Sequence, residues 1–455
     1  MCPCMSGGGW VRGVGIIGAG YVGLTLGVFL ASKYVRTICV EKDEEKVGRI
    51  MKGLSPIHEQ GLPELLRQVV EDGVLEARTE IGDMFEEVDV IFITVGTPTG
   101  SDGSPDLSQV EEASRQIGNA LAASKTGAPL IVVKSTVPPG TTWGIVRPII
   151  EKTSDRVCGK DFHLCVNPEF LREGSALQDT MNPDRIVIGT KHSWAAESLK
   201  KFYETLYNPK KIPMLITSPT NAELIKLATN AYLALKISFI NLISQICEAV
   251  EDGDVGVVAE GLGLDPRIGP LFLRAGLGFG GSCLPKDLRA LKWFAAGLGV
   301  DASLLDSVLA INGAQRIRVV KKSESLLGGL RGRKVAVLGL AFKPGTDDVR
   351  EAAAIEIIRE LLARGAEVRV HDPAALDNAM RVLGGGVTYC QRIQDCLDGA
   401  DLAIISTEWP EYALLDPSTV MSLMHNPIII DGRRILDNKR FREAGVKTYT
   451  IGLYQ

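Results

Sequence analysis

The pattern Gly18-x-Gly20-x-x-Gly23 limits the folds open to this chain more than any other feature of the sequence. It follows the apolar run VGII and opens onto the helical run YVGLTLGVFLAS, after which RTICVEKD forms a second apolar run that ends in acids. This order of strand, glycine turn, helix and strand is typical of a dinucleotide-binding βαβ unit. The glycines there give a tight turn, room for a pyrophosphate and close helix packing. A glycine-rich turn with a structural role only is the alternative.

Glu41 stands at the end of the second apolar run, where an acid accepts hydrogen bonds from an adenosine ribose. This position favours NAD over NADP as the cofactor. Lys46 follows in the same segment and is able to pair with a phosphate, so strict discrimination between NAD and NADP stays open.

Further apolar runs alternate with helical patterns through VDVIFITVGTP, PLIVVKSTVPPGTT, FHLCVNPEFLREG and DRIVIGT. Such runs predict an α/β fold with a doubly wound parallel sheet that helices cover on both faces. After Gly328 the same texture returns in RKVAVLGLAFKPGTDD, AEVRVHDP, ADLAIISTEW and PIIIDGRRIL. This second Rossmann-like unit lacks the glycine fingerprint, because Leu340, Ala341 and Phe342 follow Gly339. We therefore expect it to bind a different ligand.

Between these regions lies one long helical pattern, TNAELIKLATNAYLALKISFINLISQICEAVE. Thr220 and Glu223 have the spacing of a capping box, and Gly253 and Gly256 are expected to end the helix. An apolar stripe at helical period consists of Leu224, Leu227, Ala228, Ala231 and Leu235. We expect the helix to join two domains and to bury a face against a second subunit, which predicts a homodimer.

The length of 455 residues predicts two or three domains. We place a dinucleotide-binding Rossmann domain at residues 1–214 and a central helical and dimerisation domain at residues 215–327. A second Rossmann-like domain occupies residues 328–455.

Charge and cysteine content exclude several classes of protein. The net charge of −5 argues against nucleic acid and membrane surfaces as partners, although a local basic pocket for a small anion stays open. The nine cysteines show neither zinc-ligand spacing nor a disulfide framework, which indicates a reducing, cytoplasmic location and no metal. Neither a secretory leader nor a membrane span is predicted. Cys2 and Cys4 are interpreted as part of a flexible terminus, with a metal site as the alternative.

Four polar residues follow apolar strands, at the edge where open α/β sheets bind ligands. Thr97 and Thr136 offer hydroxyl groups there, although ordinary turn chemistry explains both motifs equally well. Glu169 and Glu173 are four residues apart and would share a face on a helical turn. They are either solvated acids or a fixed general base and water-orienting group.

Lys226 and Asn230 are four residues apart on the long helix, beside the apolar stripe. Such a pair is able to stabilise an oxyanion, and the alternative is a lysine that reaches solvent beside a packing asparagine.

In GFGGSCLPKD the glycines let the backbone come close to a ligand. Cys283 is either a small core residue or a nucleophile, whose thiolate a nearby cation or helix N-terminus would favour. Asp287 would instead hold a water, and Lys286 has no assigned role.

Together, these motifs resemble the UDP-glucose/GDP-mannose 6-dehydrogenase family. The resemblance rests on GAGYVG, VGTP, STVPPGT, NPEFLREGSA, NPDRIVIG, ELIKLATNAYLALKISFIN, GFGGSCLPKD and GLAFKPGTDDVRE, in this order over residues 13 to about 434. It implies oxidation of a sugar carbon 6 alcohol to a carboxylate with two NAD reduced. Cys283 would form a thiohemiacetal and then a thioester, which water hydrolyses.

The same resemblance implies further roles. Lys226 and Asn230 would stabilise the oxyanion, and Asp287 and Thr136 would hold the water. Glu169 would be the general base. The predicted cofactor site consists of Gly18, Gly20, Tyr21, Val22, Glu41, Lys46, Thr97, Thr136, Glu173 and Arg350. The predicted substrate site consists of Phe170, Leu171, Lys226, Arg267, Phe279, Gly280, Lys343 and Arg433.

Within this second set the resemblance separates two kinds of contact. Arg267 would reach the substrate of the partner subunit, which again implies a dimer. Lys343 and Arg433 would contact the nucleotide diphosphate, whereas Arg350 and Glu173 would lie near the cofactor. The second Rossmann-like domain would therefore bind the UDP-sugar.

The Gly-Gly-Ser-Cys form before the lysine and aspartate fits the UDP-glucose and GDP-mannose branches of the family. We favour oxidation of UDP-glucose to UDP-glucuronate, with GDP-mannose or another UDP-sugar as the alternative. A nucleotide-sugar sensor without turnover and a two-electron dehydrogenase are rival classes. The joint presence of Cys283, Lys226, Asn230 and Asp287 argues against both. Glu41 departs from the more frequent aspartate of the family.

Overall fold

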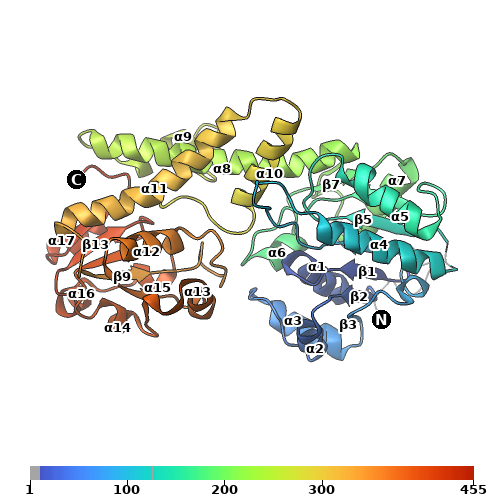
Figure 1. Cartoon of the computed structure of the whole chain (residues 1–455), viewed down its shortest axis with the longest axis horizontal. Helices are drawn as coiled ribbons and strands as arrows, with labels where there is room; N and C mark the ends of the chain where they lie inside the picture. The colour runs from blue at the N-terminus through green and yellow to red at the C-terminus, as the bar shows by residue number, and fades with distance from the viewer. Residues whose placement is uncertain (1–10, 126) are drawn as a thin grey trace. The chain divides into compact units, whose positions relative to one another are not determined.

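The computed structural model describes residues 11–125 and 127–455 and divides the chain into two compact units (Figure 1). The first unit comprises Met1–Thr229 and Arg289–Phe294, and the second comprises Asn230–Leu288 and Ala295–Gln455. The three-domain division at 214/215 and 327/328 stays a prediction. Cys2 and Cys4 lie outside the described residues.

An eight-stranded sheet forms the first unit, in the order β3-β2-β1-β4-β5-β6-β7-β8. The strands are β1 (Val14–Ile17), β2 (Thr37–Val40), β3 (Leu75–Arg78), β4 (Val90–Ile93), β5 (Leu130–Val133), β6 (His163–Val166), β7 (Ile186–Gly189) and β8 (Met214–Thr217). Neighbours pair in parallel, except that β6 and β7 meet in an antiparallel pair of Val166 with Gly189. The carboxyl ends of β1, β4, β5 and β6 therefore share one edge of the sheet.

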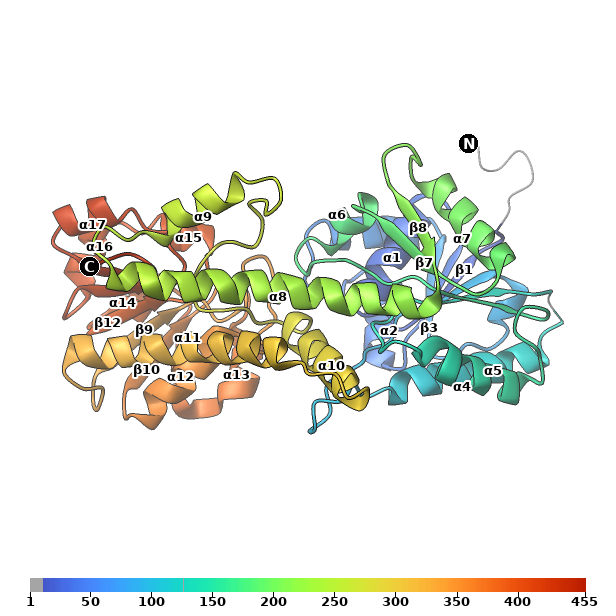
Figure 2. The same ribbon diagram turned by 90° about the horizontal axis from the view of Figure 1, so that it is seen from above.

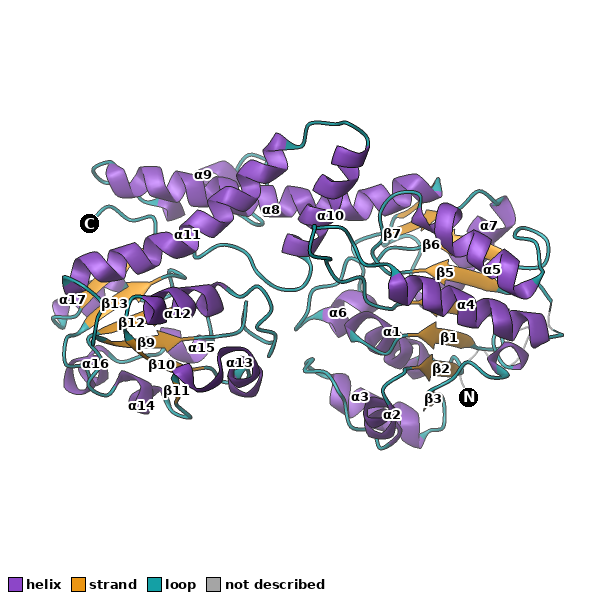
Figure 3. Ribbon diagram, viewed as in Figure 1, coloured by secondary structure: helices purple, strands orange, loops and turns teal. Residues whose placement is uncertain are grey.

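Helices cover both faces of this sheet, as the near-continuous apolar strands require (Figure 3). Along β4, Val90 and Phe92 are buried in one core, whereas Ile91 and Ile93 are buried in the other. The helices are α1 (Tyr21–Ser32), α2 (Glu44–Met51), α3 (Leu62–Glu71), α4 (Ser108–Ala123), α5 (Arg147–Ser154), α6 (Ala176–Met181) and α7 (Ser193–Leu206), with the short η2 (Met84–Glu86) and η3 (Thr142–Val146).

A six-stranded, fully parallel sheet forms the core of the second unit, in the order β11-β10-β9-β12-β13-β14. Its strands are β9 (Lys334–Leu338), β10 (Glu367–His371), β11 (Thr388–Tyr389), β12 (Leu402–Ile405), β13 (Ile428–Asp431) and β14 (Lys447–Thr450). The first six strands of the other sheet follow the same order in sequence, so the predicted repeat of two Rossmann-like units is confirmed.

The second unit also contains helices on both faces of its sheet and a helical region before it (Figure 1). They are α9 (Val255–Gly263), α10 (Leu284–Gly297), α11 (Ser303–Leu327), α12 (Ala353–Ala363), α13 (Leu376–Leu383), α14 (Ile393–Leu397), α15 (Pro410–Ala413), α16 (Pro417–Leu423), α17 (Asn438–Glu443) and η4 (Gly384–Gly386). The Arg289–Phe294 part of α10 belongs to the first unit.

Helix α8 (Pro219–Ala249) is one continuous element, seen along its length in Figure 2. It ends before Gly253, and Gly256 lies in α9. The predicted capping box is replaced by a longer-range contact, because the Glu223 carboxylate accepts hydrogen bonds from the N–H groups of Gly140 and Thr142. Among the described residues, α8 is the one helix with the length and hydropathy of a membrane span. Its bonded, buried polar side chains are typical of an internal helix.

Candidate functional site

The glycine turn after β1 has the geometry that a bound pyrophosphate needs. Gly18 has a φ of 101°, which favours glycine, and a Cβ at Gly23 would lie 1.9 Å from the carbonyl oxygen of Gly18. Gly20 begins α1, and no atom lies within 4 Å of the place where its Cβ would be. There is therefore space beside this helix N-terminus, which is the part of a helix that binds phosphate groups.

Glu41 is buried directly after β2, and its carboxylate approaches the glycine turn. Its Oε2 accepts a hydrogen bond from the N–H of Ala19 at 3.1 Å, and its Oε1 accepts one from Asp43 at 3.3 Å. Each carboxylate oxygen has a second lone pair for a ribose hydroxyl. Lys46 lies in the first turn of α2, two positions after Glu44. The turn and this acid thus fit a dinucleotide of the NAD type.

The loops after β4 and β5 meet through the two threonines that the motifs indicated. Thr97 is buried, and its hydroxyl donates to the carbonyl oxygen of Thr136 at 2.8 Å. The Thr136 side chain is partly exposed. The Glu223 carboxylate on α8 holds the same β5 loop at Gly140 and Thr142. This loop is therefore fixed from two sides.

Glu169, which follows β6, forms a buried ion pair with Lys226 of α8. Their Oε1 and Nζ atoms are 2.8 Å apart, and the side chains are 8% and 4% exposed. Burial raises the pKa of Glu169, but the Lys226 ammonium and the N–H of Leu171 outweigh it, so the net pKa is lowered. Leu171 donates to the second carboxylate oxygen at 2.5 Å. Glu169 is therefore held as a carboxylate in a nearly dry setting.

The segment after Glu169 is a loop, and the expected helical turn with Glu173 is not formed. α6 begins later, at Ala176. Phe170 lies with its ring 5.6 Å from Lys226 Nζ and 3.8 Å from the Arg185 guanidinium. Glu173 is partly buried. The two acids thus have different surroundings, which their spacing alone did not predict.

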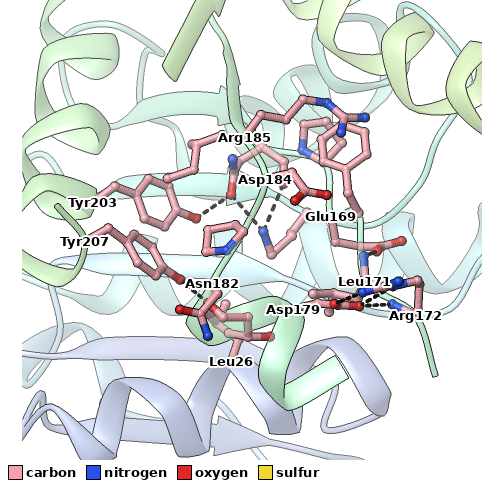
Figure 4. Close-up of a pocket in the computed structure, with 17 residues that line it drawn as sticks. Leu26, Glu169, Leu171, Arg172, Asp179, Asn182, Asp184, Arg185, Tyr203 and Tyr207 are labelled. Atoms are coloured by element: carbon pink, nitrogen blue, oxygen red, sulfur yellow. Dashed lines mark hydrogen bonds and ion pairs between the residues drawn. The ribbon is translucent and has the colours of Figure 1, made fainter. Parts of the chain in front are cut away.

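A cavity of about 70 Å³ lies behind Glu169 and is lined from β5, β6, α6 and α7 (Figure 4). Lys134 borders it and donates to Asn167 Oδ1 at 2.9 Å, and Tyr203 donates to the same oxygen at 2.5 Å. Burial lowers the pKa of Lys134 to about 8, against the opposing effect of Glu169. The sequence motifs did not indicate a role for this second lysine, although Lys134 directly precedes the STVPPGT motif.

Cys283 lies in the second unit, immediately before α10, so the N-terminus of that helix faces its segment. The Ser282 hydroxyl is 3.5 Å from its Sγ. Asp287, one helical turn further on, is 1% exposed and has an ammonium partner, Lys286, at 2.6 Å. Its other oxygen accepts from Asn230 Nδ2 at 2.5 Å. Lys286, to which no role had been assigned, therefore balances the buried charge of Asp287.

The glycines before Cys283 permit a backbone course that other residues would block. Gly278 and Gly281 have φ values of 93° and 81°, and a Cβ at Gly280 would lie 2.3 Å from the carbonyl oxygen of Glu351. The buried Phe279 donates its N–H to Asn312 at 2.7 Å. The segment that carries the cysteine is thus fixed by tight backbone packing.

The remaining predicted ligand residues are arginines and a lysine of the second unit. Lys343 lies in the loop after β9, with its Nζ 5.5 Å from the Phe342 ring. Arg433 follows β13 and contacts Glu408 at 3.3 Å. Arg350 and Arg267 are exposed, and each forms an ion pair within its own loop, with Asp348 at 2.7 Å and Asp265 at 2.6 Å.

The predicted residues thus gather in two groups. The first unit holds the glycine turn, Glu41, the threonine pair, and Glu169 with Lys226. The second unit holds Cys283, Asp287 and Asn230, and separately the cations after β9 and β13. α8 contributes Lys226 to the first group and Asn230 to the second, four positions apart.

Two Rossmann-like sheets, one with an intact dinucleotide turn, define a class of nucleotide-dependent α/β enzymes. Three models of the UDP-glucose/GDP-mannose dehydrogenase family match the chain in succession: the NAD binding domain at residues 12–207, the central domain at 220–314 and the UDP binding domain at 336–438. The chain therefore belongs to this family, and it is an NAD-dependent nucleotide-sugar dehydrogenase.

Individual relatives match nearly the whole length. A UDP-glucose 6-dehydrogenase of Bacillus subtilis is 42% identical over 437 residues, which cover 96% of this chain and 97% of the relative. One from Rickettsia bellii is 40% identical over 438 residues, with 96% and 98% covered. The structure of a UDP-glucose dehydrogenase from Pyrobaculum islandicum superimposes with a TM-score of 0.91 at 41% identity and covers 100% of both chains.

Proposed function

We propose that the protein oxidises UDP-glucose to UDP-glucuronate with two NAD, through a covalent intermediate on Cys283. The observation that carries the proposal is the setting of this cysteine: it precedes a helix and is one turn from a buried aspartate that an amide and an ammonium hold in place. A core cysteine needs no such arrangement. The names of the relatives supply the choice of sugar.

The overall reaction converts one alcohol, two NAD and one water into one carboxylate, two NADH and three protons. NAD, when bound, takes one hydride from carbon 6 in each oxidation step. The Cys283 thiolate bonds to the aldehyde carbon, and the resulting thiohemiacetal is oxidised to a thioester. Water then displaces the sulfur, which leaves the carboxylate and regenerates the thiol.

Charge on the sugar oxygen develops at each of these steps, and two donors suit it. Lys226 has three N–H donors and uses one on Glu169, and Asn230 has two and uses one on Asp287. Glu169 takes up protons, because it is an ionised carboxylate. Asp287 and Thr136 hold the hydrolytic water.

The nucleotide part is assigned to the second unit, whose central stretch matches a UDP binding domain. Lys343 and Arg433 supply positive charge to the diphosphate. Phe170, Leu171, Phe279 and Gly280 surround the sugar. In the cofactor site, Glu173 and Arg350 complete the set begun by the glycine turn and Glu41.

We also infer a homodimer formed through α8, in which Arg267 contacts the substrate of the partner subunit. Four large apolar residues are exposed at helical spacing on this helix, Tyr232, Phe239, Leu242 and Ile246, and the exposed Val250 directly follows it. An exposed apolar row of this kind marks a contact surface. The seven cysteines within the described residues are free thiols, which supports a cytoplasmic location.

The test is a panel of UDP-glucose, UDP-galactose, UDP-N-acetylglucosamine and GDP-mannose, each assayed for NADH release and for the acidic sugar product. We expect kcat/KM to be highest for UDP-glucose and the product to be UDP-glucuronate. Preference for GDP-mannose would assign the other branch of the family. Binding of nucleotide sugars without NADH release would support the sensor instead.

A further inference from the structure

Lys134 lies beside Glu169 because of the sheet. β5 and β6 are parallel, with Val133 opposite Val166, so the residues that follow each strand are neighbours. The Lys134 ammonium donates to Asn167 Oδ1 at 2.9 Å. Tyr203 donates to the same oxygen, and Asn167 Nδ2 donates to a backbone carbonyl at 2.8 Å. Both the oxygen and the nitrogen of this amide are therefore bonded, and the oxygen fixes the direction of the lysine.

The charges around the cavity beside Glu169 do not cancel within the ion pair of Glu169 and Lys226.

 

Lys134 and Lys226 are two cations that face one carboxylate, Glu169. The other charged groups that line the cavity are largely engaged elsewhere: Arg172 pairs with Asp179 at 2.6 Å, and Arg185 stacks on the Phe170 ring at 3.8 Å. Asp184 lies at the rim of the same cavity. Burial raises the pKa values of Tyr203 and Tyr207, so both phenols stay neutral.

We propose that Lys134 is a positioning residue of the active site, whose ammonium group keeps Glu169 in the carboxylate form that pairs with Lys226 and accepts protons. The inference rests on the proposed function, because it gives Glu169 a role in turnover. Lys134 acts through Glu169 and Asn167 and needs no contact with substrate. A cation in the same cavity stabilises the ionised form of an acid and opposes its protonation.

Lys134→Met tests the charge, because methionine has a similar length and no ammonium group. Without the cation the pKa of Glu169 rises, so the acid-side fall of kcat moves to higher pH by about 1 unit. The variant should therefore lose turnover on the acid side at a pH where the wild type stays active. Lys134→Arg restores the charge and is expected to restore the wild-type profile. Tyr203→Phe removes a neighbouring donor but no charge, and its profile should match the wild type.

A second measurement needs no substrate. Burial lowers the pKa of Lys134 from 10.5 to about 8, so between these values the unfolded chain binds more protons at this residue than the native protein. The wild type should therefore gain stability relative to Lys134→Met as the pH rises through that range. Urea unfolding of both proteins at a series of pH values measures this difference.

The outcomes separate this inference from the proposed function. A wild type that fails to oxidise UDP-glucose contradicts the proposed function, and the unfolding series then still tests the buried charge of Lys134. An active wild type with the same acid limb as Lys134→Met overturns the inference. So does a stability difference that is independent of pH. Failure of Lys134→Met to fold would also overturn it, because a neutral isostere of a desolvated lysine should be tolerated.

Discussion

Lys226 and Glu169 show how a reactive pair depends on its surroundings. Both side chains are more than nine-tenths buried, and their charged atoms are 2.8 Å apart. Charges in such a setting are favourable only when the partner is present, because each has lost its hydration. The same dry setting strengthens the interaction of a lysine with an oxyanion.

Lys226→Met should therefore affect both stability and catalysis. It leaves the Glu169 carboxylate buried without its partner, which costs about 3 kcal/mol of the free energy of unfolding. kcat should fall by at least about 10²-fold, with a smaller change in KM. Urea unfolding and steady-state kinetics measure the two effects. The double variant Lys226→Met/Glu169→Gln should recover most of the stability but none of the activity, and full recovery of activity would contradict the catalytic role.

Cys283→Ser tests the covalent route. Serine keeps the size of the side chain but not the thiolate, so production of UDP-glucuronate should fall at least about 10³-fold. NAD binding, followed by calorimetry, should stay unchanged. Cys158→Ser is the matched control, since Cys158 is also a free, partly exposed cysteine but lies far along the chain in the first unit. Full activity of Cys283→Ser would refute the nucleophile.

The sequence motifs indicate candidate residue types for the site, but they do not indicate which residues are in contact. Cys283 and Lys226 stand in short motifs whose chemistry is recognisable without a structure. Lys134 could not be found in this way, because its position beside Glu169 depends on the pairing of β5 with β6. Lys286 was left unassigned for the same reason, since its contact with the buried Asp287 depends on the local backbone.

At the scale of the element, α8 buries several polar side chains and exposes several apolar ones, which is the reverse of the usual pattern of a surface helix. Its buried positions include Glu223, Lys226, Asn230, Ser238 and Asn241. Its exposed positions include the apolar row defined above, from Tyr232 to Ile246. The periodicity of the sequence indicated a helix correctly, but it could not tell which face is covered. That depends on what packs against the helix.

The apolar stripe expected from the sequence shows that helical periodicity alone does not predict which residues are buried. Leu227 and Ala231 are buried, whereas Leu224 and Ala228 are exposed. The capping box expected at the start of the helix is likewise absent, because Glu223 binds the loop after β5. Both differences arise from partners that are distant in sequence.

The apolar row of α8 predicts a dimer that charge should disrupt. Phe239→Asp or Ile246→Asp places a carboxylate in the contact surface, so sedimentation velocity should show a shift from dimer to monomer. Leu414→Asp is the control, because Leu414 is 80% exposed on another part of the second unit. A wild type that sediments as a monomer, or charged variants that stay dimeric, would contradict a contact through this helix.

At the scale of the whole molecule, one strand order occurs twice with different turns. Gly18, Gly20 and Gly23 open directly onto α1 after β1. After β9, Gly339 is followed by a long loop before α12, and Asp372 accepts the N–H groups of Leu340 and Ala341. The first turn leads directly into a helix N-terminus, whereas the second leads into a loop, and in both an acid after the next strand accepts backbone N–H groups of the turn.

If NAD and the UDP-sugar bind in different units, a substitution in one site should weaken the binding of one nucleotide only. Gly20→Val is expected to fold, because a Cβ there would have no other atom within 4 Å, and to fill the space for the pyrophosphate. It should abolish NAD binding and leave UDP binding intact. Arg433→Ala should weaken UDP binding at least about 10-fold and leave NAD binding intact. Calorimetry with each nucleotide alone measures both, with Gly48→Ala as the control. Loss of both ligands in either variant would contradict separate sites.

The number of NADH molecules released for each UDP-glucose consumed tests the central claim most directly. A limiting, known amount of UDP-glucose is incubated with excess NAD until absorbance is constant, and the remaining sugar nucleotide is quantified by chromatography. The covalent route through Cys283 predicts a ratio of two, with UDP-glucuronate as the product. A ratio of one, with an aldehyde as the product, would contradict it.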